Sequence, residues 1–77
     1  MKRLDEPITV IPADGPPRRI AWRGNTVPVE ALVDYWVLEG KWWMNRARRV
    51  YLRLQTPAGT LDVYRRNTSW HLDRVVD

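Results

Sequence analysis

Residues 49–55 carry the sequence pattern that most constrains the fold. Aliphatic side chains occupy every second position, and charged, aromatic or amide side chains lie between them. The aliphatic row is Val50, Leu52 and Leu54, and the other row is Arg49, Tyr51, Arg53 and Gln55. Because side chains alternate across a strand, this pattern predicts a half-buried strand with one aliphatic face and one Arg/Tyr face.

Other segments repeat this alternation between turn-forming residues. Residues 8–11 end at a proline and are rich in β-branched types, which predicts a short edge strand. Residues 18–23, 61–66 and 70–76 also alternate. Gly24 and Asn25 fit the central positions of a type II′ hairpin, which would pair Arg23 with Thr26. Residues 56–60 and 67–69 have turn composition, so three antiparallel strands should follow one another as a meander.

Residues 27–39 fit two different structures. Val29, Leu32, Val33 and Trp36 have helical spacing, and Gly40 could end a helix. Residues 33–37 are instead rich in β-branched and aromatic types, which favour a strand. We favour a bent strand, with one short helix within residues 29–39 as the alternative.

The chain has the length of one domain. Its 77 residues contain no cysteine, so packing of five Trp and three Tyr must replace disulfide bonds. We expect a loose N-terminal segment at residues 1–7 and a single β domain at residues 8–77. The predicted fold is all-β, as a small SH3-like barrel or a curled antiparallel sheet of five to six strands, because rolling up a sheet hides its edges.

The tryptophans are expected to divide between core and surface. Trp22 and Trp70 share strand faces with aliphatic residues, and Trp36 is expected in the core as well. Trp42 and Trp43 are adjacent, so in an extended chain they point in opposite directions and cannot both enter one core. One of them is therefore exposed for stacking, or the pair lies in a loop that covers the core.

Basic residues gather in the second half of a chain whose net charge is +4. From residue 41 to residue 66 there are seven basic residues and a single acid, Asp62. A surface that combines arginines with aromatic rings is typical of proteins that bind single-stranded nucleic acid, since cations contact phosphates and rings stack on bases. The candidate nucleic-acid-binding residues are Arg46, Arg48, Arg49, Arg53, Tyr51, Tyr64, Arg66 and Trp43.

The same residues also have a purely structural interpretation. Arginine side chains can cover tyrosine rings on a solvated sheet face through cation–π contacts. Arg53 would in addition be neutralised by Asp62 if the two lie opposite each other on neighbouring strands. The sequence leaves both interpretations open.

Residue patterns of catalytic, cofactor or metal sites are not found in the sequence. His71 and Ser69 are the only His and Ser, and no third group is marked to complete a triad. The carboxylates are scattered without metal-ligand spacing, and the glycines are isolated. The sequence has no apolar signal or membrane segment either, so we expect a cytoplasmic protein that is not an enzyme.

Several landmarks together resemble a known group of bacterial proteins. The landmarks are Ile20-Ala21-Trp22-Arg23-Gly24, Trp42-Trp43, Arg49-Val50-Tyr51-Leu52-Arg53-Leu54, Asp62-Val63-Tyr64 and the ending Trp70-His71-Leu72-Asp73-Arg74-Val75-Val76-Asp77. Over residues 8–77 the chain resembles an uncharacterised family of small bacterial proteins with a Trp-Arg-Gly hairpin, a Trp-Trp pair and a Trp-x-Leu-x-Arg-Val-x-Asp ending. That resemblance implies no known activity.

Residues 40–77 are also similar, more loosely, to the C-terminal segment of the polymerase-like accessory subunit of the bacterial mutasome. This resemblance implies DNA repair by translesion synthesis and contacts with polymerase, clamp or DNA. The 77 residues hold no polymerase-like body, so the resemblance does not place the chain in the mutasome.

We therefore expect a non-enzymatic module that binds nucleic acid, in the first place DNA, with little sequence preference. One alternative is a protein-interaction module that docks an acidic or Pro-rich segment. Another is a module that associates with itself through a sheet edge or a Trp patch. No membrane partner is expected.

Overall fold

The computed structural model of this chain describes residues 2–12, 15–38 and 48–76. These residues form seven strands: β1 (Lys2–Ile11), β2 (Arg19–Trp22), β3 (Asn25–Pro28), β4 (Ala31–Leu38), β5 (Arg49–Thr56), β6 (Gly59–Arg66) and β7 (Ser69–Val76). All seven join in one antiparallel sheet with the order β3-β2-β1-β7-β6-β5-β4. The predicted all-β class and curled sheet are confirmed, with seven strands where five or six were expected. Within the described ranges, no helix could cross a membrane.

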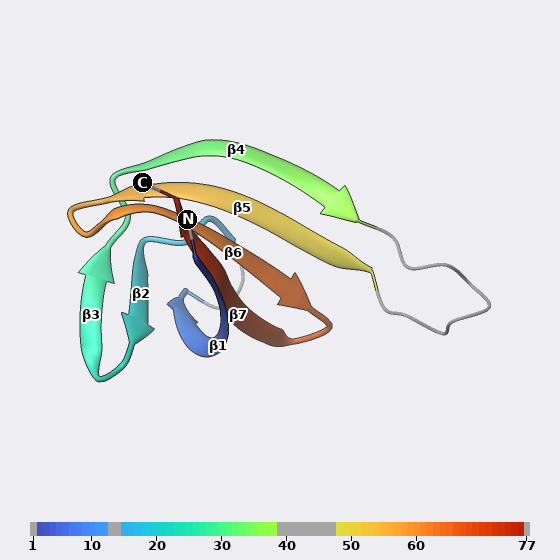
Figure 1. The fold of residues 1–77 in the computed structure, drawn as a ribbon, viewed down its shortest axis with the longest axis horizontal. Helices are drawn as coiled ribbons and strands as arrows, with labels where there is room; N and C mark the ends of the chain where they lie inside the picture. Colours follow the sequence, from blue (N-terminus) through green and yellow to red (C-terminus); the bar gives the residue numbers. More distant parts are fainter. Residues whose placement is uncertain (1, 13–14, 39–47, 77) are drawn as a thin grey trace.

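The sheet curls because its two outermost strands are consecutive in the chain. β3 and β4 stand at opposite ends of the strand order, yet only Val29 and Glu30 connect them. The Val29 N–H donates to the Arg18 carbonyl at 2.8 Å, and the Glu30 N–H donates to the Gln55 carbonyl at 2.8 Å. These two bonds hold the connection between β2 and β5, so the sheet edges approach each other at this end. Figure 1 shows β3 rising to meet the start of β4 there.

The hydrophobic core lies on the concave, inner face of this curled sheet. Its fully buried members are Ile20, Leu54, Leu61, Val63 and Leu72. Ile20 comes from the β2–β3 hairpin, which therefore packs across the inner face of the β5–β6–β7 meander (Figure 1). Trp22 and Trp70 pack against the core, as expected from the aliphatic neighbours on their strand faces.

The predicted meander of β5, β6 and β7 is confirmed. Leu52 pairs with Val63, and Val63 pairs with Leu72, so aliphatic residues line one face of all three strands. The first turn is Pro57-Ala58, closed by Gly59 with φ 113°. The second turn begins at Asn67, whose φ of 57° lies in the left-handed region that asparagine tolerates.

The N-terminal segment belongs to the sheet, so the predictions of a loose segment at residues 1–7 and of an edge strand at residues 8–11 are wrong. Lys2 pairs with Val75, and Pro7 pairs with His71. β1 lies between β7 and β2 as an inner strand. Without β1, one edge of β7 would present a row of unpaired backbone groups. Pairing with β1 satisfies these groups, and this explains why a segment of charged composition forms a strand.

The β2–β3 hairpin turns one residue earlier than predicted. Trp22 pairs with Asn25 and Ala21 with Thr26, so the two turn residues are Arg23 and Gly24. Both have positive φ, 51° and 78°, as a type I′ turn requires. The left-handed conformation of Arg23 is held from outside the turn, because its guanidinium pairs with Glu6 and lies over the Trp22 ring at 4.9 Å.

Residues 27–38 follow the strand interpretation. β3 ends at Pro28, and β4 begins at Ala31 and pairs with β5 along its length. A register shift between Leu32 and Asp34 marks the bend that was predicted for this segment.

Candidate nucleic-acid interface

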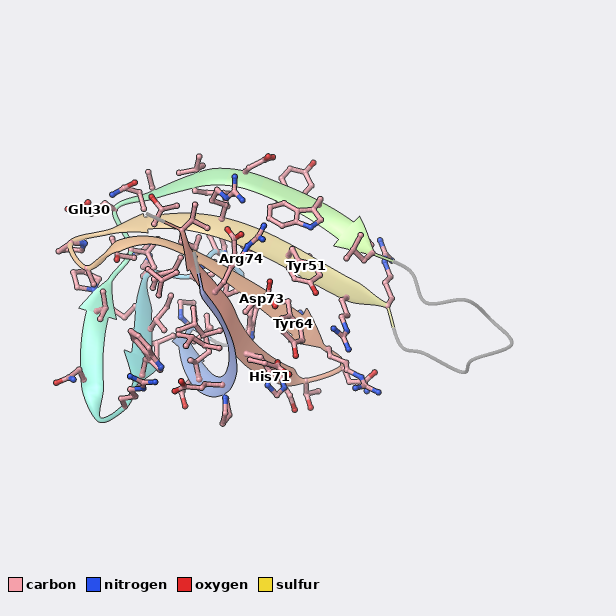
Figure 2. The ribbon with its side chains drawn as sticks, viewed as in Figure 1. Glu30, Tyr51, Tyr64, His71, Asp73 and Arg74 are labelled. Atoms are coloured by element: carbon pink, nitrogen blue, oxygen red, sulfur yellow. The ribbon has the colours of Figure 1, made fainter. Side chains whose placement is uncertain are left out.

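Four aromatic rings form a continuous row on the convex, outer face of the sheet. They stand opposite one another on neighbouring strands: Trp36 on β4, Tyr51 on β5, Tyr64 on β6 and His71 on β7. Trp36 and Tyr51 stack at 5.3 Å between ring centroids with an interplanar angle of 3°. Tyr51 and Tyr64 follow at 5.2 Å and 37°, and Tyr64 and His71 at 5.0 Å and 14°. We call these four residues the aromatic ladder; Figure 2 shows its last three members in a row across β5, β6 and β7.

The two tyrosines that were predicted to stack on bases are covered by their neighbours in the aromatic ladder. Tyr51 and Tyr64 are each only 4% exposed, and each has an aromatic neighbour on both sides. The Arg49 guanidinium lies over the Tyr64 ring at 4.9 Å. The prediction that both tyrosines are exposed is therefore wrong, because the rings of adjacent strands and an arginine fill the space beside them. The expectation that Trp36 lies in the core is also wrong, because Trp36 is half-buried in this outer row.

Tyr64 is also fixed by a hydrogen bond from β1. Its hydroxyl donates to Asp5 Oδ1 at 2.5 Å across a sequence separation of 59 residues. Burial and the nearby Asp5 carboxylate raise the pKa of Tyr64 to about 12. Asp5 reaches this position because it lies at a register shift in β1 and adopts a φ of 49°.

A second outer row, next to the aromatic ladder, is built around the buried carboxylate of Asp62. Asp62 has no solvent exposure and lies opposite Arg53 on one side and Arg74 on the other. Arg53 donates to both carboxylate oxygens, at 2.8 and 3.0 Å, and Arg74 Nε donates at 2.9 Å. Burial alone would raise the pKa of Asp62, but the hydrogen bonds and charges of the two arginines bring it below its usual value of 3.8.

Arg53 is therefore a structural residue, and its assignment to the binding surface is wrong. Its guanidinium is held by Asp62 and also lies over the Trp36 ring at 5.5 Å. The carboxylate of Asp62 raises the pKa of Arg53 through hydrogen bonding and charge. For Arg53, Tyr51 and Tyr64, the purely structural interpretation of the basic strand face is the one the structure supports.

The remaining basic residues of β5 and β6 meet at one end of these strands. Arg49 lies directly opposite Arg66, and Arg65 lies opposite Val50. We call Arg48, Arg49, Arg65 and Arg66 the arginine end. The row that contains Arg49 and Arg66 continues to Leu38 on β4 and Ser69 on β7, so it includes no acid.

Two members of the arginine end are oriented by contacts that leave charge at the surface. Arg65 is exposed and donates from Nε to the Asn67 carbonyl at 2.8 Å. Arg49 is half-buried, and its pKa is raised mainly by a hydrogen bond with Tyr51. Like charges opposite each other on neighbouring strands destabilise a sheet, by roughly 0.2–1 kcal/mol. An anion bound between Arg49 and Arg66 would remove that repulsion.

The structure thus brings together three of the eight predicted residues, Arg48, Arg49 and Arg66. Arg53, Tyr51 and Tyr64 have structural partners instead, and for the two tyrosines one of these partners is Arg49 itself. Arg46 and Trp43 lie outside the described residues, as do Lys41 and Trp42.

Sequence reasoning missed Arg65 as a member of the arginine end. Of the partners that fix the outer face, it predicted Asp62 opposite Arg53, which is confirmed, but not Asp5 or Arg74. Asp62 carried a usable signal, since it is the one acid among seven basic residues in its part of the chain. Asp5 and Arg74 carried none, because their roles depend on the pairing of β1 with β7 and on the register of β7 against β6. Among the residues that the structure describes, no group of three His, Cys, Asp or Glu side chains could hold a metal ion.

Comparison with known proteins gives no relative from which a function could be transferred. No family model matches the sequence, and no curated protein or solved structure matches it either. The resemblances described above, to a family of small bacterial proteins and to a mutasome subunit, therefore stay predictions.

Proposed function

We propose that this chain is a non-enzymatic module that binds the phosphate backbone of nucleic acid, single-stranded DNA in the first place, through the arginine end. The observation that carries the proposal is the direct apposition of Arg49 and Arg66 in a row without an acid. Arg48 and Arg65 are their neighbours in the chain, and Arg65 starts from the other face of the sheet, opposite Val50 and Trp70. Arginine presents several donors in a fixed plane and suits phosphate better than lysine does. The proposal does not use Tyr51 or Tyr64 for base stacking, because both rings are covered.

The contacts of the arginine end also support binding without sequence preference. Phosphate contacts fix position but do not discriminate between bases. On the described part of the outer face, Tyr51 and Tyr64 each have a ring neighbour on both sides, at 5.0–5.3 Å, so neither offers a free ring face to a base. We therefore expect affinity to depend on salt far more than on base composition.

Fluorescence anisotropy with labelled single- and double-stranded oligonucleotides at two salt concentrations tests this proposal. Arg66→Glu is the most informative variant, since Arg66 is exposed and its replacement leaves the Asp62 ion pairs intact. Loss of one or two phosphate contacts should weaken binding at low salt and reduce the slope of log affinity against log salt by about 0.7 per contact.

Arg19→Glu is the matched control. Arg19 is exposed on β2, and its replacement changes the net charge by the same amount away from the arginine end. Binding should survive this change with its salt slope unaltered. The proposal is refuted if the wild-type chain does not bind at low salt, or if the two variants weaken binding equally.

A protein partner is the second candidate, and the exposed hydrophobic residues of β4 favour it. Five residues of this strand are large, apolar and exposed: Leu32, Val33, Tyr35, Val37 and Leu38. This feature is independent of the arginine end.

A further inference from the structure

β4 is an outer strand with an unusual composition for that position. It has eight residues, of which five are exposed hydrophobics and only Asp34 is charged. Proteins normally protect an exposed edge by charges, prolines or a short strand. The opposite edge, β3, follows that rule, with four residues that include Thr26 and Pro28 and no exposed large hydrophobic.

The part of β4 after its register shift is regular and suited to strand pairing. Residues 34–38 pair with β5 without interruption, and in the described part of the chain no strand pairs with the other edge of β4. That edge therefore presents backbone N–H and C=O groups that a further strand could satisfy. Tyr35 lies opposite Leu52 on the inner face and is 66% exposed.

The aromatic ladder indicates what the further strand should carry. Each ring of the ladder is covered by the ring directly opposite on the next strand, and the row stops at Trp36 only because β4 is the edge. A neighbouring strand with an aromatic residue opposite Trp36 would continue the row. A second copy of β4, placed antiparallel about Trp36, supplies that residue.

We propose that two copies of this chain associate by antiparallel pairing of β4 with β4, centred on Trp36. In this register Tyr35 lies opposite Val37 of the other copy, and Asp34 lies opposite Leu38. This register keeps the two Asp34 side chains apart, because each lies opposite Leu38 and not opposite the other Asp34.

The symmetry of this contact fits a closed dimer, and its size fits a weak one. The paired segment contains three of the five exposed hydrophobics, Tyr35, Val37 and Leu38, so the contact buries less than the roughly 1,000 Å² of a stable specific interface. A contact about a two-fold axis uses the same strand from both copies and cannot propagate into a fibre. The dissociation constant is accordingly expected in the micromolar range.

Sedimentation velocity over a range of concentrations tests the dimer, with Tyr35→Lys as the disrupting variant and Thr26→Lys on β3 as the matched control. Both replaced residues are exposed, and both variants gain one positive charge. The wild-type chain and Thr26→Lys should reach twice the chain mass of 9.1 kDa. Tyr35→Lys should raise the dissociation constant at least about tenfold, because it puts charge into an apolar contact. Circular dichroism checks that all three are folded.

Disulfide formation tests the register, and the absence of native cysteine makes it unambiguous. A mixture of the variants Tyr35→Cys and Val37→Cys should give the mixed disulfide faster than either variant alone, since these positions are paired in the proposed register. A wild-type chain that stays monomeric, or cross-linking no faster than that of Thr26→Cys, would overturn the proposal. If the chain is monomeric, the outer edge of β4 would be available to a different protein or to another part of this chain.

Discussion

The carboxylate of Asp62 connects three strands of the sheet at a single residue. It has no solvent exposure and accepts hydrogen bonds from Arg53 on β5 and Arg74 on β7. A buried charge is tolerated only when it is paired and hydrogen-bonded. Each arginine side chain is about one third exposed, 30% for Arg53 and 33% for Arg74, so water can compensate the cations in part if the acid is lost.

Replacing Asp62 by Asn should destabilise the fold by about 2 kcal/mol at neutral pH, less than the usual cost of breaking a fully buried pair because of that partial exposure. Urea denaturation gives the value. Asp34→Asn is the control: Asp34 is exposed, and we expect a change below about 0.5 kcal/mol. Equal effects of the two substitutions would contradict the role assigned to Asp62.

The contribution of Asp62 should also depend on pH in a defined direction. Its pKa is lower in the folded state than the usual value of 3.8, so its stabilisation is complete above that value and is lost as pH falls through the folded pKa. The difference in unfolding free energy between the wild-type chain and Asp62→Asn should therefore shrink below about pH 4. A constant difference across this range would show that charge is not involved.

Tyr64 should reveal its hydrogen bond to Asp5 at the other end of the pH scale. Because its folded pKa is raised from 10 to about 12, the stabilisation is present below pH 10 and is lost as pH rises through 12. Absorbance of tyrosinate should show a transition near pH 12 that is absent in Tyr64→Phe. Asp5→Asn should move this transition to lower pH, since the hydrogen bond to the carboxylate and its charge both raise the pKa. A transition that persists in Tyr64→Phe would contradict the assignment.

At the scale of the element, alternation along a strand predicted side-chain direction well and side-chain exposure poorly. Leu52 and Leu54 face the core and Tyr51 faces outward, as the pattern of residues 49–55 indicates. Tyr51 is nevertheless buried, because exposure on the outer face depends on what the neighbouring strands place beside it. Charged residues 2–7 gave no strand signal, since their pairing with β7 is set by the fold and not by local preference.

The two hairpin glycines should differ in how much they tolerate a side chain. A Cβ atom at Gly24 or Gly59 would meet nothing within 4 Å, so only backbone strain opposes Ala. The φ of Gly24 is 78°, close to the left-handed region that other residues occupy, whereas the φ of Gly59 is 113°. We expect Gly24→Ala to cost about 1 kcal/mol and Gly59→Ala about 2 kcal/mol in urea denaturation. The reverse order would contradict this explanation.

At the scale of the whole molecule, two features of one curled sheet point to different partners. The arginine end lies beside the Leu38 end of β4, and the exposed hydrophobics lie along β4. The sequence predicted the curled sheet and the gathering of basic residues. It could not predict which arginines stay at the surface, because that depends on Asp62 lying opposite Arg53 while Arg49 lies opposite Arg66. Nor could it predict that β4, flanked by strands in the chain, is an outer strand.

The two proposals together predict that long single strands bind with higher affinity than short ones. In the proposed dimer the two arginine ends lie on opposite sides of the paired β4 strands. Strand spacing and rise put the two Arg49 residues about 20 Å apart and the two Arg66 residues about 28 Å apart. An extended single strand spans about 6 Å per nucleotide, so an oligonucleotide of about three nucleotides cannot reach both arginine ends, whereas one of about 30 nucleotides can. A strand that reaches both ends gains affinity, because its second contact is intramolecular. In anisotropy titrations at protein concentrations where dimers form, Tyr35→Lys should weaken binding of the long strand and leave the short strand unchanged. Arg66→Glu should weaken both. An unchanged ratio of long-strand to short-strand affinity in Tyr35→Lys would show that the two arginine ends act independently.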